Sequence, residues 1–202
     1  EKNLFNNELF IQLEKLKPQY FDETDAKTKA ALKRKIDGLI NHLTNGKETF
    51  DFEIYFSEVF HTKGGFDVLI GNPPYIGEKG HKELFLEVKN GPLVRFYLGK
   101  MDYFYFFFHL ALNIGRKNAQ IAFITTNYYL TAFGAKKLRE DFKSRSSIRH
   151  LTNLNELKIF ESALGQHNII TILSKTKNEK IMAMNCLTRR RGFSNSEILQ
   201  CV

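Results

Sequence analysis

The first fifty residues show apolar side chains at helical spacing. Over residues 25–44 these side chains recur three and four positions apart, which is the spacing of one face of a helix, and an Asn-Gly pair at 45–46 ends the series. An earlier apolar series is interrupted at Pro18. The pattern therefore predicts an α-helical hairpin over residues 1–50, and no group of its side chains suggests chemistry.

Beyond residue 50, short apolar runs alternate with helical patterns. Residues 66–70 are a run of the kind that forms buried parallel strands. The predicted strands cover residues 66–70, 120–125, 148–154 and 168–173, and the predicted helices cover residues 101–116 and 134–144. Strands that alternate with helices predict an α/β fold with a parallel sheet, here over residues 51–175. Residues 176–202 have weak periodicity and are typical of a linker or the start of a further domain.

Composition places the chain among ordinary globular proteins. Of its 202 residues, 43% are hydrophobic and 26% are charged, which argues against wholesale disorder. The longest apolar stretch, at 101–112, is too short to span a bilayer, and no secretory signal opens the chain. The two cysteines form neither a disulfide framework nor a metal cluster. These features favour a cytoplasmic protein that binds no metal.

The positive charge lies in the second half of the chain. The formal net charge is +8, and residues 101–202 carry 15 Lys and Arg against 7 Asp and Glu. Such a field attracts polyanions, most commonly nucleic acid, although runs of charge are usually just solvated surface. The candidate contacts to a DNA backbone are Lys136, Lys137, Arg139, Lys143, Arg189, Arg190 and Arg191.

One segment carries recognisable chemistry, the run FDVLIGNPPYI at residues 66–76. It places Asn72, Pro73, Pro74 and Tyr75 directly after a predicted strand, where ligands bind in open α/β sheets. The preceding Gly71 permits close approach of the backbone to a ligand, and the two prolines stiffen the loop.

The residues of this motif are suited to binding an exocyclic amino group. The Asn72 side-chain oxygen and the Pro73 carbonyl provide two acceptors for the two amino protons, and Tyr75 provides a flat face for stacking. Such hydrogen bonds strengthen as positive charge develops on the nitrogen, so they favour the transition state over the ground state.

Residues 72–75 match the NPPY signature of S-adenosylmethionine-dependent N6-adenine DNA methyltransferases. The surrounding sequence resembles the methylase portion of type II restriction–modification enzymes, and residues 102–112, 120–130 and 138–170 resemble the segments that follow the signature there. The resemblance implies the C-terminal half of a Rossmann-like methyltransferase core, with residues 1–50 as a helical insertion.

The resemblance also assigns roles to individual residues. Asn72 and Pro73 would accept hydrogen bonds from the amino group of an adenine that is flipped out of double-stranded DNA, and Tyr75 would stack on that base. Phe160 falls where the family places a second aromatic side chain against the base. The candidate contacts to S-adenosylmethionine are Gly71, Phe107 and Asp51.

One family feature is missing from the sequence. No glycine-rich cofactor loop precedes Asn72, which suggests a fragment of a longer bacterial enzyme that is inactive by itself. The expected partners are double-stranded DNA, the missing N-terminal half and a target-recognition domain of the same protein. Methyl transfer needs no metal, and Mg²⁺ would serve only a nuclease domain outside this chain.

Two other functions stay open at this point. A protein glutamine N-methyltransferase also uses an NPPY motif, because an amide nitrogen has the same delocalised lone pair. A non-catalytic remnant or interaction module could keep the shape of the motif without binding the cofactor.

Overall fold

The computed structural model describes residues 2–46, 50–160, 166–176, 184–189 and 191–193. The chain divides into two compact units, residues 1–65 and 66–202. The boundary lies between Gly65 and Phe66, so the segment that follows residue 50 begins within the helical unit.

The first unit is entirely helical in its described residues. Its helices are α1 (Lys2–Asp22), α2 (Ala26–Leu43), α3 (Phe52–Tyr55) and α4 (Ser57–Lys63). The prediction of a helix over 25–44 is confirmed, and the Asp25 carboxylate caps α2 by accepting a hydrogen bond from the Thr28 amide at 2.8 Å. The expected interruption at Pro18 is wrong, because α1 continues through this residue to Asp22.

A buried lysine ties α1 to the end of α3 and to α4. The Lys17 ammonium donates to the Tyr55 carbonyl at 2.6 Å and to the Glu58 carboxylate at 2.7 Å. Leu13, one turn earlier on α1, is fully buried. This unit therefore has a small core of its own.

The second unit is a mixed α/β structure, which confirms the predicted α/β class. Its main sheet has the order β1-β2-β5-β3-β6, formed by β1 (Phe66–Gly71), β2 (Gly115–Thr126), β5 (Asn168–Ser174), β3 (Ser147–Asn153) and β6 (Met184–Leu187). The short strands β4 (Leu157–Lys158) and β7 (Gly192–Phe193) pair separately. The remaining elements are α5 (Lys82–Asn90), α6 (Phe104–Ile114), α7 (Lys136–Arg145) and the 3-10 turns η1 (Val94–Phe96), η2 (Asn127–Leu130) and η3 (Phe133–Ala135).

The prediction of an all-parallel sheet is wrong. β1 and β2 are parallel, as are β3 and β6, but β5 runs antiparallel to both β2 and β3 and lies between them. An antiparallel neighbour needs no crossover helix, and β3 and β5 are linked through β4 alone among the described elements.

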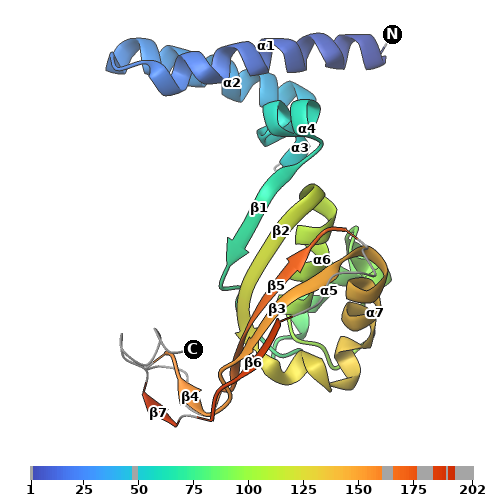
Figure 1. Cartoon of the computed structure of the whole chain (residues 1–202). Helices are drawn as coiled ribbons and strands as arrows, with labels where there is room; N and C mark the ends of the chain where they lie inside the picture. Colours follow the sequence, from blue (N-terminus) through green and yellow to red (C-terminus); the bar gives the residue numbers. More distant parts are fainter. Residues whose placement is uncertain (1, 47–49, 161–165, 177–183, 190, 194–202) are drawn as a thin grey trace. The chain divides into compact units, whose positions relative to one another are not determined.

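Helices cover one face of the sheet. Figure 1 shows α6 and α7 against the same side of the strands. Phe108 of α6 is fully buried there, with ring centroids 4.9 Å from Phe123 of β2 and 5.0 Å from Phe142 of α7. The aromatic residues 103–108 are therefore mostly part of the core, because the hydrophobic effect favours burying these side chains over exposing them at a ligand site.

One face of the edge strand β1 is exposed. Leu69 packs against the core, but Val68 and Ile70, which point to the other face, are 62% and 82% exposed. The prediction that residues 66–70 form a fully buried strand is therefore wrong in the described part of the chain. Only the helix-side face of β1 is covered, and β2 is its single strand neighbour there.

Candidate active site

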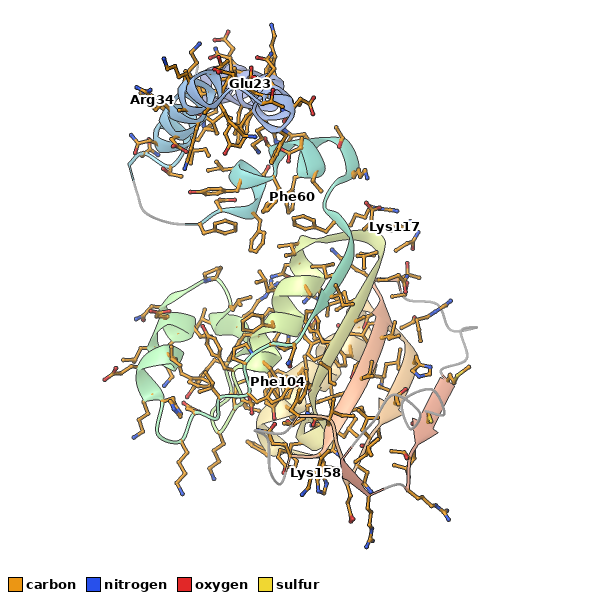
Figure 2. All side chains as sticks on the ribbon, turned by 90° about the vertical axis from the view of Figure 1, so that its left-hand side faces the viewer. Glu23, Arg34, Phe60, Phe104, Lys117 and Lys158 are labelled. Carbon is orange, nitrogen blue, oxygen red and sulfur yellow. The ribbon has the colours of Figure 1, made fainter. Side chains whose placement is uncertain are left out.

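The NPPY loop begins where β1 ends. β1 and β2 run parallel, with Gly71 beside Phe123, so their carboxyl ends meet at one edge of the sheet. The antiparallel β5 starts at the same edge, with Asn168 opposite Thr126. In Figure 2, Phe104 lies toward this edge and Lys117 lies at the opposite one, where β2 begins. The predicted position of the motif, directly after a strand, is confirmed.

The four motif residues differ in exposure. Asn72 and Pro74 are exposed, Pro73 is buried, and Tyr75 is half-buried. The Tyr75 ring packs edge-on against Phe104 of α6, with centroids 6.0 Å apart. The Asn72 amide is therefore accessible to a ligand, while the Tyr75 ring beside it is held by its packing.

The Tyr75 hydroxyl is the hydrogen-bonding centre of the loop. It lies 2.5 Å from Asn72 Oδ1 and 3.0 Å from the Ile124 carbonyl, and these two acceptors share its single proton. Burial raises the pKa of Tyr75 to about 12, although a hydrogen bond with the Asn168 side chain opposes the rise. The hydroxyl is therefore protonated near neutral pH and can donate.

A second anchor holds the chain just after the motif. Asp102 Oδ1 accepts hydrogen bonds from the Ile76 amide at 3.1 Å and from the Phe104 amide at 3.3 Å. The Tyr103 amide donates to the Ile76 carbonyl at 2.8 Å. Burial raises the pKa of Asp102, although these amides oppose the rise. Sequence reasoning missed this residue, whose signal is a single acid that immediately precedes an apolar helix.

The three predicted cofactor contacts have different surroundings. A Cβ at Gly71 would meet the Phe123 ring at 3.5 Å, an ordinary contact, so the glycine is not required by the packing on that side. Phe107 is half-buried and packs against Tyr103, with centroids 5.8 Å apart. Asp51 lies in the first unit, where it accepts from the Glu53 amide at 2.8 Å as the cap of α3. The cofactor roles of these three residues stay predictions.

Phe160, the expected second stacking residue, lies shortly after β4 and is half-buried. Residues 161–165, which follow it, lie outside the described residues. The stacking role of Phe160 stays a prediction.

The candidate basic contacts fall into two groups. Lys137 donates to the Arg95 and Tyr97 carbonyls at 2.6 and 2.8 Å. Arg139 donates to the Tyr129 and Ala132 carbonyls at 2.7 and 2.8 Å. Both side chains therefore stabilise the fold. The more solvent-directed group is Lys136, Lys143, Arg189 and Arg191, although Arg191 pairs with Glu156 at 2.7 Å and Arg190 lies outside the described residues.

The described ranges contain neither a metal-binding cluster nor a membrane-spanning helix. No group of His, Cys, Asp and Glu there could hold a metal ion. No helix among these residues is both long enough and apolar enough to cross a membrane.

Comparison with known proteins gives two curated relatives. The type II methyltransferases M.HincII and M.HindII, both of Haemophilus influenzae, are each 27% identical over 129 residues, or 63% of this chain. These matches cover 25% and 24% of the relatives, so the chain spans only about a quarter of their length.

Solved structures give weaker matches. The type ISP restriction-modification enzyme LlaGI has a TM-score of 0.48 at 17% identity, over 77% of this chain and 19% of that one. The M protein of the type I restriction enzyme EcoKI has a TM-score of 0.47 at 11% identity, over 89% and 42%. TM-scores below 0.5 carry no weight in assigning this chain to a family.

The family assignment rests on a sequence model. The model of the Eco57I restriction-modification methylases matches residues 3–160, which includes the helical unit, the NPPY loop and most of the sheet. The chain therefore belongs to the Eco57I restriction-modification methylase family.

Proposed function

We propose that the full-length protein transfers a methyl group from S-adenosylmethionine to adenine N6 in DNA, as part of a restriction–modification system. The observation that carries the proposal is the placement of the exposed Asn72 beside the half-buried Tyr75, at the carboxyl end of β1. Family membership and the names of the two relatives, both type II methyltransferases, support it.

The chemistry of the loop supports an amino-group substrate. An amino group on an aromatic ring has two protons to donate, and Asn72 Oδ1 and the Pro73 carbonyl are both acceptors. Asn72 Oδ1 already accepts from Tyr75, but an amide oxygen has two lone pairs, so one is left for a ligand. The cofactor supplies an electrophilic methyl group, and the two acceptors would orient the nitrogen lone pair toward it.

The protein reaches its target base only when the base leaves the helix. Adenine N6 lies inside the duplex stack, so we propose base flipping, with stacking on Tyr75 and Phe160 as partial compensation. The exposed cations Lys136, Lys143 and Arg189 are the proposed contacts to the DNA backbone. A target-recognition domain and the remaining core would come from other parts of the protein.

Methylation of DNA by the full-length protein tests the proposal. The protein is incubated with unmethylated DNA and S-adenosylmethionine, and the nucleosides are measured by mass spectrometry. We expect N6-methyladenine from the wild type, and none from Asn72→Ala even though DNA binding is retained. Asn7→Ala, a change at an exposed asparagine of α1, is the matched control.

Other products would redirect the assignment. Methylated cytosine in place of adenine would refute the adenine target. Methylation of a protein glutamine would favour the other NPPY chemistry, which family membership does not favour. No transfer at all by an intact, DNA-binding protein would support a non-catalytic module.

A further inference from the structure

The Asn72 carboxamide in the NPPY loop can adopt two orientations, which differ in the end that faces a ligand. A carboxamide has one acceptor end, Oδ1, and one donor end, Nδ2, which are nearly the same size. Only the Oδ1 end can accept from an amino group. Because Asn72 is exposed, packing does little to choose between the two orientations.

The Tyr75 hydroxyl selects one of these two carboxamide orientations. At 2.5 Å from Asn72 Oδ1 it donates to the oxygen, because this separation fits an O–H···O hydrogen bond and is shorter than the N–H···O bond that the Nδ2 end of a rotated carboxamide would make with the hydroxyl oxygen. The hydroxyl is itself anchored to the sheet, because it also lies 3.0 Å from the Ile124 carbonyl of β2.

The surroundings of the hydroxyl favour this polarity. Asn168, which is 1% exposed at the start of β5, forms a side-chain hydrogen bond with Tyr75. The Asn168 amide nitrogen also points toward the Thr125 carbonyl, at 3.5 Å, so its donor end faces this cluster. With a donor on one side, the Tyr75 oxygen accepts there and directs its own proton toward the carbonyl and Asn72.

From this geometry we infer a second task for Tyr75 beyond stacking: its hydroxyl holds the Asn72 carboxamide with Oδ1 presented to the substrate amino group. The inference rests on the proposed function of the loop. Tyr75 then acts twice, through its ring on the base and through its hydroxyl as a positioning group for Asn72.

The test separates the hydroxyl from the ring. In the full-length enzyme, Tyr75→Phe keeps the ring and removes the hydroxyl. We expect kcat for DNA methylation to fall about fivefold, the loss that corresponds to one hydrogen bond, with KM for DNA within about twofold. The fluorescence of a 2-aminopurine at the target position, which reports flipping, should be unchanged because the stacking surface is kept.

A second background isolates the orientation itself. Asn72→Asp puts an acceptor at both ends of the side chain, so no wrong orientation exists. In that background, Tyr75→Phe should have no further effect on kcat. Tyr129→Phe is the matched control, because the Tyr129 hydroxyl also makes a buried bond, 2.7 Å from Thr171 Oγ1, and this bond does not involve Asn72.

The kinetic outcomes each decide the inference. An unchanged kcat in Tyr75→Phe overturns it, and so does an equal loss in the Asn72→Asp background or in Tyr129→Phe. A faster Tyr75→Phe enzyme also overturns it, because the hydroxyl would then compete with the substrate for Oδ1.

A readout without activity keeps this test independent of the proposed function. In protein labelled with ¹⁵N at asparagine, the Asn72 carboxamide signals are those lost in Asn72→Asp. They should shift in Tyr75→Phe and stay in place in Tyr129→Phe, and the opposite result overturns the inference. If the wild type forms no N6-methyladenine, the proposed function fails, and these signals still show whether the hydroxyl holds the amide.

Discussion

Asp141 gives the most direct quantitative test of the core. Its carboxylate lies between two basic groups, with Oδ2 2.5 Å from His109 Nδ1 and 2.5 Å from an Arg145 nitrogen. Burial opposes the charge, but the hydrogen bonds from Arg145 and His109 outweigh it and lower the pKa of Asp141 to about 2. Replacement by asparagine in Asp141→Asn keeps the shape and removes the charge.

The size of the effect follows from the pKa. A fall from an ordinary value of about 3.9 to about 2 contributes about 2.5 kcal/mol of stability. Because the pKa is lowered in the folded state, this contribution is complete above about pH 5 and is lost as the pH falls through about 4 toward 2. Arg145 also bonds to Asn113 Oδ1 at 2.7 Å and reaches solvent, so the variant does not strand it.

Neighbouring charges do not obscure the measurement at pH 7. His109 stacks on Phe96 with centroids 3.7 Å apart, and burial lowers the pKa of His109, so this ring is neutral there. The Arg95 guanidinium, which also acts on His109, lies over the Phe96 ring.

Hydrogen exchange with mass spectrometry localises the effect. At pH 7, amides of α6 and α7 should exchange roughly 70-fold faster in Asp141→Asn, the equivalent of about 2.5 kcal/mol. Peptides from α1 and α2 serve as an internal control and should be unchanged. The reasoning is refuted if α6 and α7 exchange at the wild-type rate, or if Asp141 titrates near its ordinary value by ¹³C NMR.

Three further predictions test other features. Gly134→Ala places a Cβ in a clash with the Lys100 carbonyl and should destabilise the protein by several kcal/mol in urea unfolding, whereas Gly38→Ala meets nothing within 4 Å in α2 and should stabilise it by up to about 1 kcal/mol. Lys137→Met should lower stability because the Arg95 and Tyr97 carbonyls lose the ammonium that donates to them. Lys136→Met should leave stability unchanged and should weaken DNA binding at low salt in a titration. Calorimetric titration of the 202-residue chain with S-adenosylmethionine should show weak or no binding, and micromolar affinity would contradict this expectation.

Local signals in the sequence were reliable where one element decides its own structure. The helical spacing over 25–44 gave α2, and the apolar run at 66–70 before Asn-Pro-Pro gave β1 with its loop. The continuation of α1 through Pro18 was missed, since a helix can accept a proline when packing compensates for the lost hydrogen bond.

Long-range pairing could not be predicted in the same way. The insertion of β5 between β2 and β3 depends on which apolar strands meet, and each strand has the same pattern in any order. The same limit applies at the site. The motif identified Asn72 and Tyr75, but the bond from the hydroxyl to Ile124, 49 residues away along the chain, exists only once the sheet has formed.

The open edge of β1 has a consequence for handling the protein in solution. Among the described residues, β1 has a strand neighbour on one side only, and a sheet edge of this kind is a template for pairing with other chains; the segment FDVLIG adds exposed Val68 and Ile70 to that template. Its single charge, Asp67, is already paired with Arg116 and gives little protection. The net charge of +8 is then the main force that keeps copies apart, so salt, which screens it, should promote association.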